Sequence, residues 1–204
     1  MTQKLNAFYE SPSQTAGPYV HIGCTPNFAG IDIYGSDLGA TMKTGPVKGQ
    51  EITIRGTVFD GMNAALKDAM IEIWQADANG LHNAASEVCG AADANFTGWG
   101  RSPGDMDTGE FVFETIKPGR VPFPDGRLQA PHVTFWVVAR GINIGLHTRM
   151  YFADEADANA KDPILTRIEH QNRIPTLLAQ AEGGGTYRFD IRLQGAGETI
   201  FFDI

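Results

Sequence analysis

The chain has 204 residues, enough for a single domain with a sizeable core. Its 24 acidic and 16 basic side chains leave a net charge of -8, which argues against nucleic acid and anionic membranes as partners. No apolar run approaches the length of a membrane span, and the N-terminus lacks the apolar stretch of a signal peptide. The only cysteines, Cys24 and Cys89, lack metal or redox spacing, so we expect a cytoplasmic protein with two free, buried thiols.

Residues 1–49 are rich in glycine and proline and show little hydrophobic periodicity. This composition predicts an extended arm with loops, and such arms commonly lie on a partner chain. From residue 51 the pattern changes to alternation, with Ile52, Ile54 and Val58 on one face. This predicts a strand, with room for a bulge at Gly56. We therefore expect an arm that contacts a partner, residues 1–49, and a β-sandwich domain, residues 50–204.

Further short segments bounded by Gly and Pro turns predict strands at residues 70–75, 111–116, 132–139, 146–152, 187–193 and 199–202. The clearest alternation is that of Tyr187, Phe189, Ile191 and Leu193 with charged neighbours. Helical patterns are confined to residues 155–161, 164–169 and 176–181. The fold class is therefore mostly β: a two-sheet β-sandwich with an extended N-terminal arm and a few short helices.

Six motifs follow one another along the β domain. They are IRGTVFD (54–60), AMIEIWQAD (69–77), FETIKPG (113–119), APHVTF (130–135), ARGINI (139–144) and LHTRMYF (146–152). Together they resemble the intradiol ring-cleavage dioxygenases, although the first two motifs alone also occur in transthyretin-like binding modules. Residues 11–20 and 195–204 sharpen the resemblance to the alpha chain of the family's two-chain members, which act on protocatechuate.

In the family that the chain resembles, the catalytic beta chain holds a non-haem ferric ion through two tyrosines and two histidines. The resemblance places these four ligand positions on His82, Val121, His132 and Thr134. The last two stand two residues apart on one predicted strand, so their side chains point to the same face. An arginine that the family keeps shortly before this pair falls near Gln129. The resemblance therefore implies no metal ligand set and no catalytic residue in this chain, with Fe(III) bound by a beta chain.

The resemblance also implies that the N-terminal arm forms a wall of the beta chain's catalytic pocket. The residues that it assigns to substrate contacts are Thr15, Gly17, Pro18 and Tyr19. Arg140 is a further substrate-binding candidate, because it follows an apolar strand and an acidic protein that admits a carboxylate needs a guanidinium nearby. Arg149 is a second candidate for this role. A plain structural use of Arg140, as an end cap or an interface ion pair, stays open.

The implied activity is the intradiol cleavage of protocatechuate (3,4-dihydroxybenzoate) by O2 to 3-carboxy-cis,cis-muconate, in the beta-ketoadipate pathway of aromatic degradation. The implied partner is a homologous beta chain in a hetero-oligomer of alpha-beta pairs, in which this chain supplies the pocket wall and assembly interface. Two alternatives stay open. One is a transthyretin-like binding module, and the other is a self-sufficient catechol-type dioxygenase with displaced ligands. For the metal, a skewed site on His82, His132 and His147 stays open, because three imidazoles can hold zinc.

Overall fold

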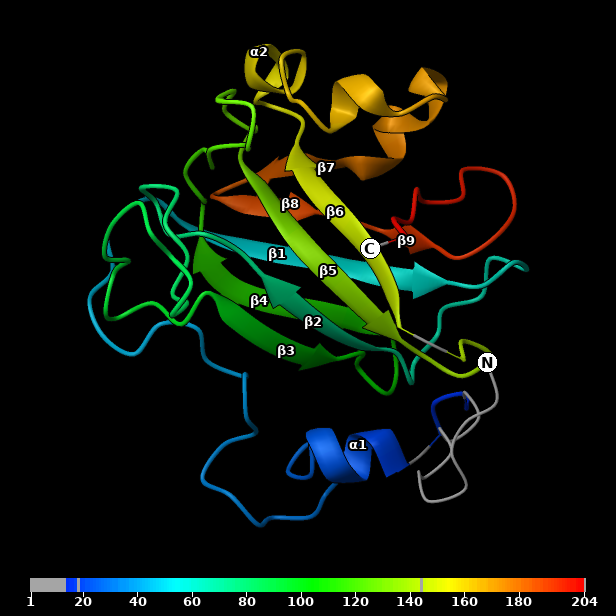
Figure 1. Ribbon diagram of the computed structural model, residues 1–204. Helices are drawn as coiled ribbons and strands as arrows, with labels where there is room; N and C mark the ends of the chain where they lie inside the picture. The colour runs from blue at the N-terminus through cyan, green and yellow to red at the C-terminus, as the bar shows by residue number, and fades with distance from the viewer. Residues whose placement is uncertain (1–13, 18, 144, 204) are drawn as a thin grey trace, which may run out of the picture.

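The structure, a computed structural model that describes residues 14–17, 19–143 and 145–203, consists mainly of β-strands (Figure 1). The strands are β1 (Glu51–Phe59), β2 (Met70–Trp74), β3 (Trp99–Pro103), β4 (Glu110–Ile116), β5 (His132–Val138), β6 (Leu146–Phe152), β7 (Leu178–Gly183), β8 (Thr186–Arg188) and β9 (Ile191–Arg192). The helices are short: α1 (Tyr19–Cys24), α2 (Ala156–Asn159) and the 3₁₀ helices η1 (Leu165–Arg167) and η2 (Gln171–Leu177). The predicted mostly-β fold class is confirmed.

The strands form one nearly closed sheet. Their order is β3-β2-β5-β6-β7-β8-β1-β4, with β9 beside β1. Strand β7 pairs in parallel with β6 and antiparallel with β8, so it joins the two halves of the sheet. The two end strands of this order, β3 and β4, also approach each other: the Val112 amide of β4 donates a hydrogen bond to Ser102 Oγ of β3 (3.2 Å). The predicted two-sheet sandwich is therefore only partly correct, because the sheet is continuous through β7.

Aromatic rings dominate the core between the two halves of the sheet. Phe135 of β5 packs against Phe111 and Phe113 of β4, with ring centroids 5.9 and 6.4 Å apart. It also packs against Phe189 at 5.1 Å, and each such pair adds about 1 kcal/mol beyond the burial of its area. Gly56 pairs with Phe111 in an unbroken register, and a Cβ at this position would lie 1.8 Å from the carbonyl oxygen of Phe189. Close packing, and not a bulge, explains this glycine.

Two predicted elements near the C-terminus differ from the structure. Residues 176–181, predicted as a helix, end η2 and then form β7, because pairing with β6 and β8 outweighs the local helix propensity. The strand predicted at residues 187–193 is split into β8 and β9. Between them Asp190 leaves the ladder, and its carboxylate accepts a hydrogen bond from the Thr57 amide (3.1 Å).

Three smaller differences concern weak patterns. Residues 199–202 form no strand, only a single bridge between Phe202 and His147. Strand β3 escapes prediction, since its sequence WGRSP contains glycine and proline. Helix α1 lies in the segment expected to be extended. The short helices at residues 155–161 and 164–169 are present as α2 and η1.

The segment between α1 and β1 lies along strand β3 of its own domain. The amide of Arg101 in β3 donates to the carbonyl of Gly39 (2.9 Å), and the amide of Thr97 donates to the carbonyl of Met42 (2.9 Å). The side chain of Met42 is 2% exposed and belongs to the main core. This part of the arm is therefore docked on the sheet, while α1 lies beyond the β3 side of the sheet, opposite α2 (Figure 1).

The two cysteines differ in exposure. Cys24 is partly buried at the end of α1, whereas Cys89 is exposed in a loop, so the prediction of two buried thiols is wrong for Cys89. Both thiols are free. None of the described helices is long and apolar enough to cross a membrane.

Candidate functional site

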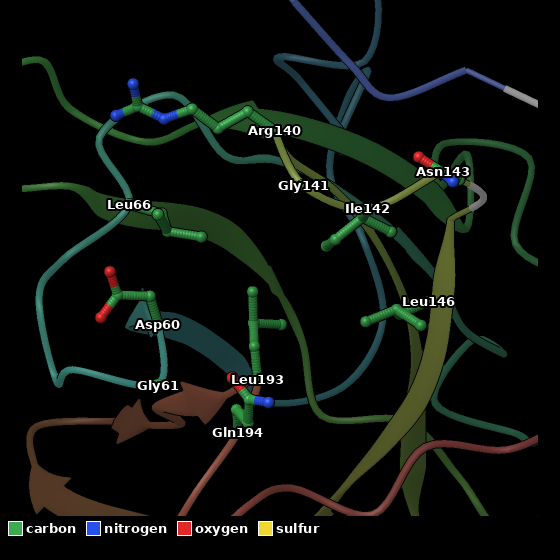
Figure 2. A pocket seen from close by; sticks show the side chains of 10 residues that line it. All are labelled: Asp60, Gly61, Leu66, Arg140, Gly141, Ile142, Asn143, Leu146, Leu193 and Gln194. Carbon is green, nitrogen blue, oxygen red and sulfur yellow. The ribbon is translucent and has the colours of Figure 1, made fainter.

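Arg140 lies at the start of the turn that follows β5, beside an open cavity of about 730 Å³. Figure 2 shows that Leu66, Ile142, Leu146 and Leu193 line this cavity, and that Arg140 stands at its rim with its guanidinium turned outward. The other lining residues are Asp60, Gly61, Gly141, Asn143 and Gln194. The cavity thus combines apolar side chains with polar ones and has a cation at one edge, features that can bind an aromatic carboxylate.

The N-terminal arm reaches the same turn. The amide of Gly141 donates a hydrogen bond to Thr15 Oγ1 (2.6 Å), although the two residues are 126 positions apart. Arg140 Nε lies 3.1 Å from Asp68 Oδ2, and its side chain is 68% exposed. The structure therefore brings together Thr15 and Arg140, two of the predicted pocket-wall residues.

The other predicted arm residues precede or begin α1. The carbonyl of Gly17 accepts the Val20 amide (3.0 Å), and among the described residues no atom beyond the chain neighbours of Gly17 lies within 4 Å of the place where its Cβ would be. Tyr19 is 83% exposed. Pro18 lies outside the described residues. Gly17 and Tyr19 thus face away from this chain's own core, where a partner chain could be contacted.

His132, at one of the family's ligand positions, is packed inside the protein. It is 8% exposed, its Nδ1 lies 2.8 Å from the carbonyl oxygen of Ala130, and its ring lies 5.7 Å from that of Tyr151. Loss of hydration on burial, reinforced by the charge of Arg149, lowers the pKa of His132 to about 4. Because a carbonyl only accepts, Nδ1 carries the proton of the neutral ring.

Thr134, the next ligand position, faces Arg149 across the β5–β6 pair. Arg149 Nη1 donates a hydrogen bond to Gln129 Oε1 (2.9 Å), and the amide of Gln129 donates to the carbonyl of Val121 (2.8 Å). A guanidinium therefore lies on the face of the sheet that His132 and Thr134 share. Arg149 is held by Gln129 inside its own domain, and the structure does not bring it together with Arg140.

His82, the first ligand position, stacks on Trp74 with ring centroids 5.8 Å apart, and its Nδ1 lies 3.7 Å from a carboxylate oxygen of Glu87. Val121 offers no side-chain donor. His147 stacks on Trp136, and the described part of the chain contains no group of three His, Cys, Asp or Glu side chains that could hold a metal ion. With a valine, a threonine and a nearby guanidinium, these positions do not fit the two tyrosines and two histidines that hold ferric iron in the family.

Two carboxylates near these positions escape sequence analysis. Asp68 pairs with Arg140, but nothing in the sequence links two residues so far apart. Asp162 is fully buried and accepts hydrogen bonds from the amides of Ala130 (2.7 Å), Ile164 (2.8 Å) and Leu165 (2.9 Å). Asp162 stands directly before Pro163 and the helical turn η1, and this order of residues is a helix-capping signal that is visible in the sequence. Asp162 fixes the start of β5 and hence the His132 backbone.

Sequence comparison places the chain among known dioxygenases. The profile of a family described as "Dioxygenase" matches residues 25–195. The protocatechuate 3,4-dioxygenase alpha chain of Pseudomonas putida is 45% identical over 197 residues, 95% of this chain and 96% of that protein. The alpha chain of Burkholderia cepacia is 40% identical over 205 residues, 98% of this chain and 100% of that protein. The beta chain of Burkholderia cepacia is 30% identical over 185 residues, 82% of this chain and 78% of that protein.

Solved structures share the fold at low sequence identity. The dioxygenase domain of a carbohydrate-binding fusion protein from Streptomyces sp. SirexAA-E has a TM-score of 0.55 at 21% identity, covering 91% of this chain and 100% of that chain. The 3-chlorocatechol 1,2-dioxygenase of Rhodococcus opacus 1CP has a TM-score of 0.57 at 20% identity, covering 76% of this chain and 64% of that chain. On the sequence matches, with the fold in agreement, the chain belongs to the intradiol dioxygenase family.

Proposed function

We propose that this chain is the alpha subunit of a two-chain protocatechuate 3,4-dioxygenase, which uses O2 to cleave protocatechuate to 3-carboxy-cis,cis-muconate in the beta-ketoadipate pathway. The observation that carries the proposal is the pattern of identities. The chain is 45% and 40% identical to two alpha chains over almost its whole length, and 30% identical to a beta chain over a shorter range.

The iron of the complex is assigned to the beta chain. The family's ligand positions in this chain hold His82, Val121, His132 and Thr134. The Val121 side chain has no atom that can bind a metal, and the His132 ring is packed against Ala130 and Tyr151. The ferric ion of the beta chain supplies the oxygen chemistry when it is bound there. This chain acts through binding and orientation of the substrate.

The arm and the turn after β5 form this chain's part of the substrate pocket. Thr15 touches Gly141, so the arm lies beside Arg140, and the exposed guanidinium is available to the substrate carboxylate. Gly17 and Tyr19 continue the same wall toward the beta chain, and Pro18, which lies outside the described residues, is assigned to it by the resemblance alone. Because the chain has a net charge of -8, a local cation of this kind offsets the repulsion that an anionic substrate meets.

The assembly interface is proposed to include the exposed apolar residues of the arm. Large apolar side chains on a soluble protein mark contact surfaces when they gather in one segment. Those of this segment are Tyr19, Ile22, Ile31, Ile33, Tyr34 and Leu38. We place the complex in the cytoplasm, where the exposed Cys89 thiol stays reduced.

The first experiment measures iron content and O2 uptake with protocatechuate, for this chain alone and for the chain co-expressed with a beta homologue. Iron and uptake that appear only in a stoichiometric complex support the proposal. Iron and turnover in the isolated chain favour a self-sufficient enzyme and contradict it. A monodisperse chain that binds a ligand alone and never pairs with the beta homologue favours a binding module and contradicts it as well.

A further inference from the structure

Asp68 lies where the arm and Arg140 meet. Its carboxylate oxygen Oδ2 is 3.1 Å from Arg140 Nε, and its main-chain carbonyl accepts a hydrogen bond from the ring Nε2 of His21 in α1 (3.1 Å). The neighbour of Arg140, Gly141, donates to Thr15 of the arm (2.6 Å). The contacts form a ring: from Asp68 to Arg140, to Gly141 and Thr15, and back through the arm and His21 to Asp68.

The two ends of the Arg140 guanidinium are used differently. The ion-pair contact with Asp68 is shortest at Nε, and in the described part of the chain no hydrogen bond engages any nitrogen of the guanidinium. A guanidinium binds a carboxylate best through a pair of parallel N–H groups, and one such pair is formed by its two terminal nitrogens. The contact with Asp68 therefore leaves this pair to an incoming carboxylate.

Asp68 is itself held by the fold. Its side chain is 37% exposed, but its second oxygen, Oδ1, is buried and has no hydrogen-bond partner among the described residues. It stands directly before the fully buried Ala69 and before β2, in which Met70, Ile71 and Ile73 are buried. Arg140 is the mobile member of the pair because its long side chain is 68% exposed. Asp68 thus restricts the rotamers of Arg140, and not the reverse.

We propose that Asp68 is a positioning residue that fixes Arg140 and the N-terminal arm as one unit and so sets the preference for a catechol that carries a carboxylate. This inference rests on the proposed function. Asp68 acts through Arg140 and does not touch the substrate. Its carboxylate orients the guanidinium before binding, which reduces the ordering cost when the substrate arrives.

The test uses the complex with the beta chain and five variants: Asp68→Ala, Asp68→Asn, Arg140→Ala, the double variant Asp68→Ala with Arg140→Ala, and Asp107→Asn. The last is the control, since Asp107 is exposed and its removal changes the net charge by the same amount. O2 uptake gives kcat and KM for protocatechuate. The inhibition constant of catechol, which has the ring without the carboxylate, measures binding that does not involve Arg140.

For Asp68→Ala we expect KM for protocatechuate to rise about fivefold, the upper value for a partly exposed ion pair, with kcat unchanged. The inhibition constant of catechol stays within about twofold, Asp68→Asn has a smaller effect, and the double variant matches Arg140→Ala because both changes remove one interaction. Asp68→Asn has the shape of aspartate and keeps the main-chain contact to His21, so it reports on the ion pair even where Asp68→Ala destabilises the turn.

Each of the following results would overturn the inference. Equal weakening of protocatechuate and catechol binding, or a loss of kcat alone, would show that Asp68 only supports the fold. A lower KM in Asp68→Asn would show that the Asp68 carboxylate competes with the substrate for Arg140. An unchanged KM in this variant would show that Asp68 does not orient Arg140. If Arg140→Ala itself leaves KM unchanged, the assignment of Arg140 in the proposed function fails, whereas an effect of Arg140→Ala without one of Asp68→Asn removes only the inference about Asp68.

Discussion

Lowering the pH should destabilise the chain through His132. Burial lowers the pKa of His132 to about 4 from the ordinary value of 6.5, with the positive charge of Arg149 as the second cause. As the pH falls below 6.5, His132 becomes protonated in the unfolded chain but stays neutral in the folded chain. Folding stability is therefore lost between pH 6.5 and about pH 4. Linkage gives a loss of about 2 kcal/mol between pH 7 and pH 5 from this residue alone.

Urea unfolding of the chain at several pH values measures the effect, and the NMR shift of the His132 ring carbon gives the pKa directly. His132→Gln removes the titrating group, so its stability should fall less steeply between pH 7 and pH 5 than that of the parent. His170→Gln is the matched control, since His170 is exposed and its removal should leave the pH profile unchanged. A ring of His132 that titrates near 6.5, or identical profiles for the parent and His132→Gln, would refute the reasoning.

Three further substitutions test the structure. Gly17→Leu should leave the unfolding of the isolated chain unchanged, since among the described residues nothing beyond its chain neighbours lies within 4 Å of a Cβ there. It should lower O2 uptake by the complex, and unchanged uptake would remove Gly17 from the pocket wall. Gly56→Ala should destabilise the chain by about 3 kcal/mol in urea unfolding, because its Cβ would meet the Phe189 carbonyl. Gly35→Ala is the control: it has open space around it and should cost less than about 1 kcal/mol. Equal effects of the two substitutions would contradict the packing argument. Asp162→Asn should cost about 2 kcal/mol, since a buried carboxylate that accepts three backbone amides becomes an amide, and a variant of parental stability would contradict that role.

The sequence predicts those strands whose side chains alternate strongly. Strands β5 and β6 appear within a residue of their predicted bounds, because their apolar and polar positions alternate and Val133 and Phe135 face the core. Strand β7 is not predictable in this way. Its sequence LAQAEG has the composition of a helix, and only the pairing with β6 and β8 makes it a strand.

The candidate site is predictable in its residue types but not in its contacts. The resemblance marks Thr15 and the ligand positions that have changed, and the charge and place of Arg140 after an apolar strand mark that residue. It cannot show that Thr15 meets Gly141 or that Asp68 holds Arg140, because each contact joins distant parts of the chain and depends on how the turns close. Nor does any sequence pattern show that Arg149 turns toward Gln129.

The contacts of Gly39 and Met42 with the segment that contains β3 mean that the arm also protects an edge of the sheet. A sheet edge with unpaired amides and carbonyls invites strands from other molecules to add to it. Here the carbonyls of Gly39 and Met42 take up amides of residues 97–101, and Ser102 bonds across to Val112. Residues 39–42 therefore cover this edge, and in the proposed complex the exposed apolar residues between 19 and 38 are the ones that contact the partner. Removing residues 39–42 should expose the edge to pairing with other molecules.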